Sequence, residues 1–290
     1  MYFENKTRFG VWGISGAVGV TIMLFPFLLG LYVPQAPYLI PLSQKVNNTI
    51  VLGLLIVLAF PAVTEFSNYQ WGRQVERNIP RLLRDVAEAV RAGVTLPKAL
   101  EDAAQRNYGP ISKELEHALS MFVLGASWDE AMMSLARRLK RPSAMRLATI
   151  FIEANQTGGR MVEVLGASVD LFSSLDEFRE EQYNNMKPYL LTIYMATIIF
   201  LTIAYVVLHQ FLAPLNAATA AVGGAHEGGL LPNVLDVNYY ASILFWASVV
   251  EAIFGGLIAG KIGDRSLSAG MRHSVVLVVT TLVFFNLTSV

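Results

Sequence analysis

Residues that could carry out chemistry are few in this sequence, and their types and spacing exclude most enzyme classes. The chain has no cysteine, which excludes a thiol nucleophile, a disulfide framework and cysteine-ligated zinc or iron–sulfur sites. It also lacks the GxxxxGK[S/T] loop that cradles nucleotide phosphates. The histidines are scattered among four segments, at His117, His209, His226 and His273. We therefore predict no catalytic residue, no metal site and no cofactor, and we expect any energy to come from a partner.

One carboxylate, Glu251, lies inside a long apolar segment. An ionisable residue at membrane depth is a candidate for function, such as proton or ion passage. Such a pathway needs partners, and the sequence offers only His209. The structural interpretation is a glutamate that faces the bundle interior and bonds to a Tyr, Ser or Thr. Both interpretations stay open at this stage.

The densest local group of charges is basic. Five cations fall within ten residues: Arg137, Arg138, Lys140, Arg141 and Arg146. One interpretation is ordinary cations at a helix C-terminus beside a solvated turn. The other is a docking surface for an acidic partner, or a contact with anionic membrane lipid. An acidic run follows later in the chain, at Asp176, Glu177, Glu180 and Glu181.

The elements that must position these residues are membrane helices. Hydrophobic residues make up 54% of the 290 residues and charged residues only 15%, whereas soluble domains carry roughly a quarter charged residues. A helix needs roughly 20 mainly apolar residues to cross a bilayer. Five segments qualify, and we predict five transmembrane helices. They are Val11 to Val33, Val46 to Val63, Tyr189 to Ala213, Tyr239 to Ala259 and the weaker Ser274 to Val290.

The distribution of Lys and Arg predicts how these spans are oriented. Of the 22 Lys and Arg, 21 fall on one side of the predicted membrane and only Lys45 on the other; residues 214–236 have none. Because cytoplasmic loops carry the excess of cations, we expect the N-terminus and residues 65–187 in the cytoplasm and the C-terminus outside. The predicted divisions are 1–64, 65–187 and 188–290. A net charge of zero gives no global attraction to nucleic acid.

Residues 65–187 form a cytoplasmic insert between the second and third spans. Apolar residues recur there at helical spacing, so we predict an all-α bundle of six helices separated by Gly and Pro. Ser127 and Glu130 have the spacing of a capping box. Gly93, Gly125 and Gly158 lie 32 and 33 residues apart. This spacing fits three repeated helical hairpins, or simply the common use of glycine at helix ends.

A small-residue pattern occurs in the fourth predicted span. Gly256 and Gly260 form a GxxxG motif, which lets helices approach closely. Packing within the chain and contact between two copies are both compatible with it.

Three short motifs give the insert a family resemblance. The sequence RAGVTLPKALE at 91–101 resembles an "AG-hydrophobic-x-L-x-x-ALE" segment, and EANQTGG at 153–159 an "E-x-x-x-x-G" joint. Between them, GASWDEA at 125–131 resembles a "G-x-S-x-x-x-A" turn. Their order, inside a helical insert bounded by spans, resembles the type II secretion system F family. These proteins are the membrane platforms of secretion systems and of type IV, Tad-type and archaeal pili.

The resemblance implies a non-enzymatic platform in the cell membrane. It implies a cytoplasmic hexameric ATPase and pilin-like subunits as partners. Because many members carry two such domains and this chain has one, it also implies a homodimer or a pair with a homologous subunit. The alternatives are a transporter or permease subunit with Glu251 in its pathway, and a membrane sensor. A transporter predicts repeats among the spans, and the sequence shows no convincing one.

Overall fold

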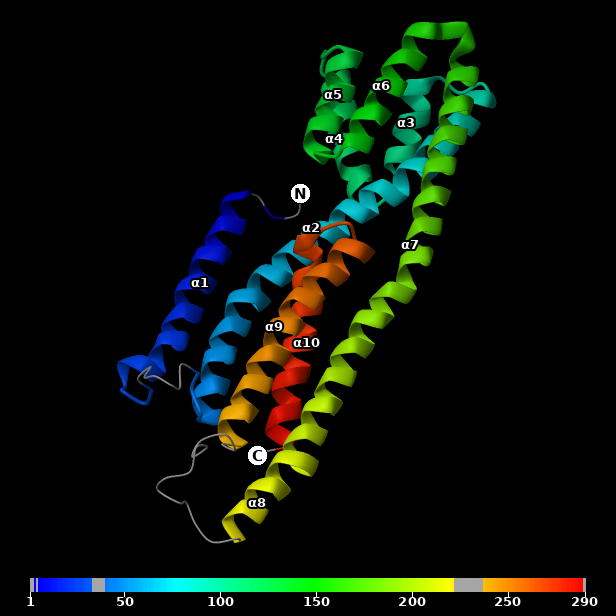
Figure 1. The fold of residues 1–290 in the computed structure, drawn as a ribbon. Coiled ribbons are helices and arrows are strands. Elements are labelled where there is room, and N and C mark those ends of the chain that lie inside the picture. The colour runs from blue at the N-terminus through cyan, green and yellow to red at the C-terminus, as the bar shows by residue number, and fades with distance from the viewer. Residues whose placement is uncertain (1–2, 4, 33–39, 222–236, 289–290) are drawn as a thin grey trace. The chain divides into compact units, whose positions relative to one another are not determined.

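All the regular structure in the described residues is helical, as predicted. The structure is a computed structural model that describes residues 3, 5–32, 40–221 and 237–288. Figure 1 shows the helices in chain order. They are α1 (Asn5–Leu28), α2 (Gln44–Arg91), α3 (Leu96–Ala104), α4 (Pro110–Val123), α5 (Trp128–Leu139), α6 (Pro142–Thr157), the 3₁₀ turn η1 (Gly158–Arg160), α7 (Met161–Tyr205), the π-helix η2 (Val206–Leu212), α8 (Ala213–Ala221), α9 (Val237–Gly263) and α10 (Leu267–Leu287).

The contacts divide the chain into two compact units. Unit 1 contains residues 1–4 and 67–185, and unit 2 contains residues 5–66 and 186–290. Helices α2 and α7 each contribute residues to both units. The predicted second span and the first helix of the insert are therefore one continuous helix, and so are the last helix of the insert and the third span. Both boundaries between the units therefore fall inside a helix.

Among the residues that the structure describes, five helices are long and apolar enough to cross a membrane, which confirms a multi-pass membrane protein. They are α1, part of α2, part of α7, α9 and α10. The helix that contains the last predicted span begins before it, because α10 starts at Leu267 rather than Ser274. Arg272 consequently lies within α10 and not in the preceding loop. The predicted span ends Val33 and Val290, and most of the cation-free stretch 214–236, lie outside the described residues.

Glycine ends two helices of unit 1 in the same way. Gly93 and Gly125 have φ angles of 91° and 102°, which a side chain disfavours. The amide after each glycine donates to a carbonyl five residues earlier, from Val94 to Ala89 and from Ala126 to Met121. Gly158, the third member of the predicted repeat, instead leads into the η1 turn.

The start of α5 is fixed by the predicted capping box. The Ser127 hydroxyl accepts from the Glu130 amide at 3.2 Å, and the Ser127 amide donates to the Glu130 carboxylate at 3.1 Å. Both bonds satisfy amides that a helix start leaves free. The next residue, Trp128, is buried and donates from its indole nitrogen to the Phe151 carbonyl of α6 at 3.0 Å. The Trp128 bond joins the start of α5 to α6.

Unit 2 has its own apolar core and a buried polar contact near the starts of α2 and α9. Its core joins Val51 of α2 with residues of α7, α9 and α10. Asn47 is fully buried, and its amide nitrogen donates to the Ser242 hydroxyl at 3.2 Å. Its amide oxygen accepts from the indole of Trp246 at 3.0 Å. These hydrogen bonds satisfy the side chain and fix α2 against α9.

Candidate functional site

The basic turn, residues 137–146, joins α5 to α6 in unit 1. Arg137 and Arg138 occupy the last turn of α5, where cations interact favourably with the helix dipole. Lys140 ends the helix in the left-handed conformation, with φ of 49°. Arg141 precedes Pro142, the first residue of α6. The end of α5 and the start of α6 at Pro142 therefore place these cations in one turn.

Two of these cations are bound within unit 1. Arg138 forms an ion pair with Glu114 of α4. The Arg141 Nε lies 3.5 Å from a carboxylate oxygen of Glu76 on α2, and its guanidinium covers Gly72. A Cβ at Gly72 would lie 2.0 Å from that guanidinium, so glycine leaves the space that Arg141 occupies. Both arginines fasten the turn to neighbouring helices.

The other three cations, Arg137, Lys140 and Arg146, are exposed. None of them forms an ion pair with any residue that the structure describes. The five cations of the turn therefore fall into two groups, two with an ion pair and three without one among the described residues. Arg138 is also exposed, but it is paired with Glu114.

A buried tyrosine links α2 to the α3–α4 turn, which the sequence did not predict. The Tyr108 hydroxyl donates to Asp85, and Arg106 donates to the same carboxylate at 3.2 Å. The guanidinium of Arg81 lies 5.6 Å from the ring centroid. Burial, and then the bond to Asp85, raise the pKa of Tyr108 to about 12. Asp85 and Tyr108 are 23 residues apart, so no local pattern indicated the contact.

Glu251 contacts a hydroxyl on a neighbouring helix of unit 2. Thr197 of α7 donates to one carboxylate oxygen at 3.2 Å. The other oxygen is buried and has no hydrogen-bond partner among the described residues. His209 instead stacks on Tyr205 and lies 3.1 Å from the Thr288 carbonyl. The structure therefore pairs Glu251 with a threonine, as in the structural interpretation, and gives His209 other neighbours.

Residues 82–209 match the family model described as type II secretion system (T2SS), protein F. We call these residues, 82–209, the F domain. This match covers the motifs at 91–101, 125–131 and 153–159 and confirms the resemblance drawn from them. The F domain contains α3 to α6, the basic turn and Thr197, whereas Glu251 lies outside it.

One relative resembles most of the chain. An uncharacterized protein of Methanocaldococcus jannaschii is 25% identical over 242 residues, which cover 83% of this chain and 38% of that protein. The chain thus spans less than half of the length of this relative. No solved structure matches the chain.

Beyond the F domain, Gly256 and Gly260 pack within the chain. A Cβ at Gly256 would lie 2.1 Å from the Ser274 amide nitrogen, and one at Gly260 2.1 Å from the Gly270 Cα. The two backbones therefore touch, because neither glycine has a side chain to hold them apart. The Ser274 hydroxyl adds a bond to the Ile253 carbonyl at 2.7 Å. The GxxxG motif is thus occupied by α10, in a hairpin with α9.

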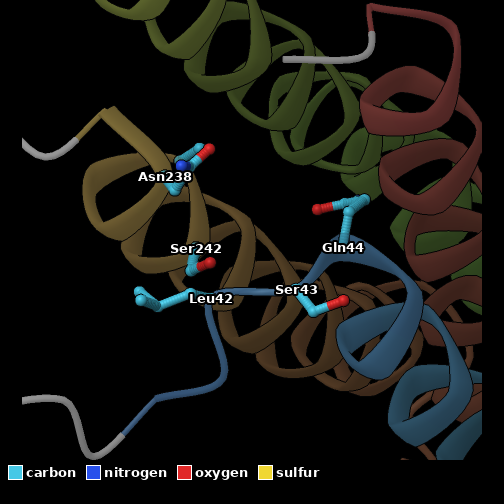
Figure 2. Close-up of a pocket in the computed structure, with 6 residues that line it drawn as sticks. Leu42, Ser43, Gln44, Asn238 and Ser242 are labelled. Carbon is cyan, nitrogen blue, oxygen red and sulfur yellow. The ribbon is translucent and has the colours of Figure 1, made fainter.

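A polar cavity of about 430 Å³ lies beside the starts of α2 and α9. Figure 2 shows Ser43 just before α2, Gln44 at the start of α2, and Asn238 and Ser242 from α9. The lining carries hydroxyl and amide groups and no charge. The sequence did not indicate this cavity, since its lining comes from segments about 200 residues apart.

Proposed function

We propose that this protein is a non-enzymatic platform of a secretion or pilus machine, in which a cytoplasmic ATPase acts on unit 1 and the spans act on the subunits being assembled. The observation that carries the proposal is the F-domain match, which extends from the helices of unit 1 into the third span. It favours a platform over the permease alternative, to which no comparison points.

The orientation is part of this proposal. With the N-terminus and unit 1 in the cytoplasm, a soluble motor can reach the F-domain helices. The distribution of cations, 21 against 1, supports this arrangement. The continuity of α2 and α7 through both units supports a mechanical link between the motor side and the membrane side.

The proposed motor contact is the exposed part of the basic turn. Arg137, Lys140 and Arg146 offer charge to an acidic surface of the ATPase, while Arg138 and Arg141 hold the turn in place. Complementary charges of this kind act mainly on encounter rate and partner choice. Contact of the turn with anionic lipid is the competing use of the same charges.

We also propose that the platform contains two F domains. The chain supplies one, so a second copy or a homologous subunit supplies the other. The mass of the detergent-solubilised complex tests this idea: at least two platform chains are expected, and a monomer with no co-purifying homologue contradicts it.

Co-purification tests the central proposal. The tagged protein is expected to retain a secretion ATPase from the same organism, and deletion of its gene is expected to abolish filament assembly or secretion. If the solubilised protein binds no such ATPase and the deletion strain assembles and secretes normally, the platform assignment is wrong.

A further inference from the structure

Polar and ring contacts join all five spans at the end of unit 2 where α2 continues into unit 1. The first contact links α1 to α2. Arg8 donates from its Nε to Glu65 at 2.8 Å, and a terminal nitrogen lies 2.5 Å from the same oxygen. The Glu65 side chain is only 7% exposed. A buried carboxylate of this kind needs its cation, so the pair fixes α1 to α2.

The second contact centres on Arg272 of α10. Its guanidinium lies 4.9 Å from the ring centroid of Phe66, the next residue of α2. The same group forms an ion pair with Asp264, whose side chain is 3% exposed, in the turn after α9. Arg272 therefore contacts both α2 and the end of α9, and it uses charge for one contact and the aromatic face for the other.

The third contact extends this link to α7. Arg272 Nε donates to His273 Nε2 at 3.3 Å, and His273 Nδ1 lies 2.7 Å from the Tyr194 hydroxyl. Because arginine only donates, Nε2 must accept, so His273 is neutral and carries its proton on Nδ1. Nδ1 then donates to the Tyr194 oxygen. These two hydrogen bonds fix the His273 side chain of α10, which contacts Tyr194 of α7.

We call these contacts, centred on Arg272 and on the Arg8–Glu65 pair, the collar. We propose that the collar clamps α2 and α7, the two helices shared with unit 1, to α1, α9 and α10, and that Arg272 is its positioning residue. A displacement that arrives along α2 enters unit 2 at Phe66, which Arg272 contacts directly. The spans then move together rather than one at a time. This inference rests on the proposed function only for the source of the displacement.

Spin-label distances in the full-length protein test the clamp without any motor. The absence of native cysteine allows labels on the exposed residues Leu52 of α2, Thr202 of α7 and Phe254 of α9, each paired with Thr280 of α10. In Arg272→Gln we expect the α2–α10 and α7–α10 distance distributions to broaden at least twofold. The α9–α10 distribution should stay narrow, because the glycine contacts hold that pair.

Two further variants sharpen the result. Tyr194→Phe keeps the ring but removes the hydroxyl, so only the α7–α10 distribution should broaden. Arg265→Gln removes the same charge from an exposed position in the α9–α10 turn and should change none of the distributions.

Equal distributions in Arg272→Gln, Arg265→Gln and the unsubstituted protein overturn the collar. If Arg272→Gln does not fold, Tyr194→Phe alone tests the collar. An unchanged α7–α10 distance distribution in Tyr194→Phe then contradicts it. Neither result bears on whether an ATPase binds unit 1. A failure of the collar can therefore be told apart from a failure of the platform assignment.

Discussion

At the scale of single residues, neighbouring cations of one turn have different roles. Arg138 and Arg141 pair with Glu114 and Glu76, whereas Arg137 is exposed and forms no ion pair with the described residues. Sequence alone showed the density of charge but could not show which charges are paired. The partners come from α4 and α2, which only the folded chain brings to the turn. Experiments on the basic turn should therefore separate the two groups.

The triple variant Arg137→Gln/Lys140→Gln/Arg146→Gln should bind the ATPase about tenfold more weakly. The binding that remains should depend less on salt concentration. Three exposed pairs contribute roughly 0.2–1 kcal/mol each, which sums to an effect of this order. Binding of purified proteins at two salt concentrations measures it. The control is the Lys113→Gln/Arg160→Gln double variant, which removes exposed charge elsewhere in unit 1. Equal losses in both variants would mean that the turn has no special role.

Tyr108 should make the protein sensitive to high pH. Its raised pKa, about 12 against an ordinary 10, means that the folded protein keeps the phenol proton after the unfolded chain has lost it. The stability that this provides is complete below pH 10 and disappears as pH rises to about 12, a loss of roughly 2 kcal/mol. Thermal unfolding of the detergent-solubilised protein from pH 8 to 12 measures it.

Tyr108→Phe should flatten the decline in stability between pH 10 and 12, while Tyr189→Phe, which removes an exposed phenol, should leave it as it is. A decline of the same steepness in all three proteins would assign the effect to other groups.

At the scale of helices, the α9–α10 hairpin depends on the absence of side chains. Gly256 and Gly260 leave no space for a Cβ, and the nearest atoms belong to the backbone of α10. A backbone cannot rotate away as a flexible side chain can. Any added carbon must therefore push the two helices apart.

Gly256→Ala should lower the unfolding free energy by about 1–3 kcal/mol, and Gly256→Leu by more, since overpacking forces backbone shifts. The thermal midpoint in detergent reports the loss. Gly16→Ala in α1, where a Cβ would meet nothing within 4 Å, is the matched control and should be neutral or slightly stabilising. A Gly256→Ala protein as stable as the control would mean that the helices are not in backbone contact.

Periodicity and hydropathy predicted the helical elements but not the residue at which α10 begins. The capping box at Ser127 and Glu130 follows from a local spacing and was predictable. The start of α10 was not, because Arg272 and His273 are polar residues that normally end an apolar span. They are tolerated because Asp264, Phe66 and Tyr194 satisfy them, and Phe66 and Tyr194 are distant in sequence. The collar could not be found without the fold for the same reason.

At the scale of the whole molecule, the absence of cysteine makes the proposed orientation directly testable. Single cysteines at Ser120 of α4 and at Ser43 before α2 are both exposed and lie in different units. We expect an impermeant thiol reagent added to intact cells to label the second site and not the first. Labelling of both after lysis is the control for reactivity. The reverse pattern in intact cells would invert the topology.

The tight α9–α10 hairpin also has a consequence for biogenesis. Helix α10 is the least apolar of the five candidate spans, and it carries the buried hydroxyls of Ser274 and Thr281. A helix of this kind enters a bilayer poorly alone, because polar groups in lipid need partners. Helix α9 precedes it in synthesis and offers a complementary groove of glycines and a carbonyl at Ile253. The two helices should therefore leave the translocation channel as one inserted pair, with α9 acting as the scaffold that admits α10 to the membrane.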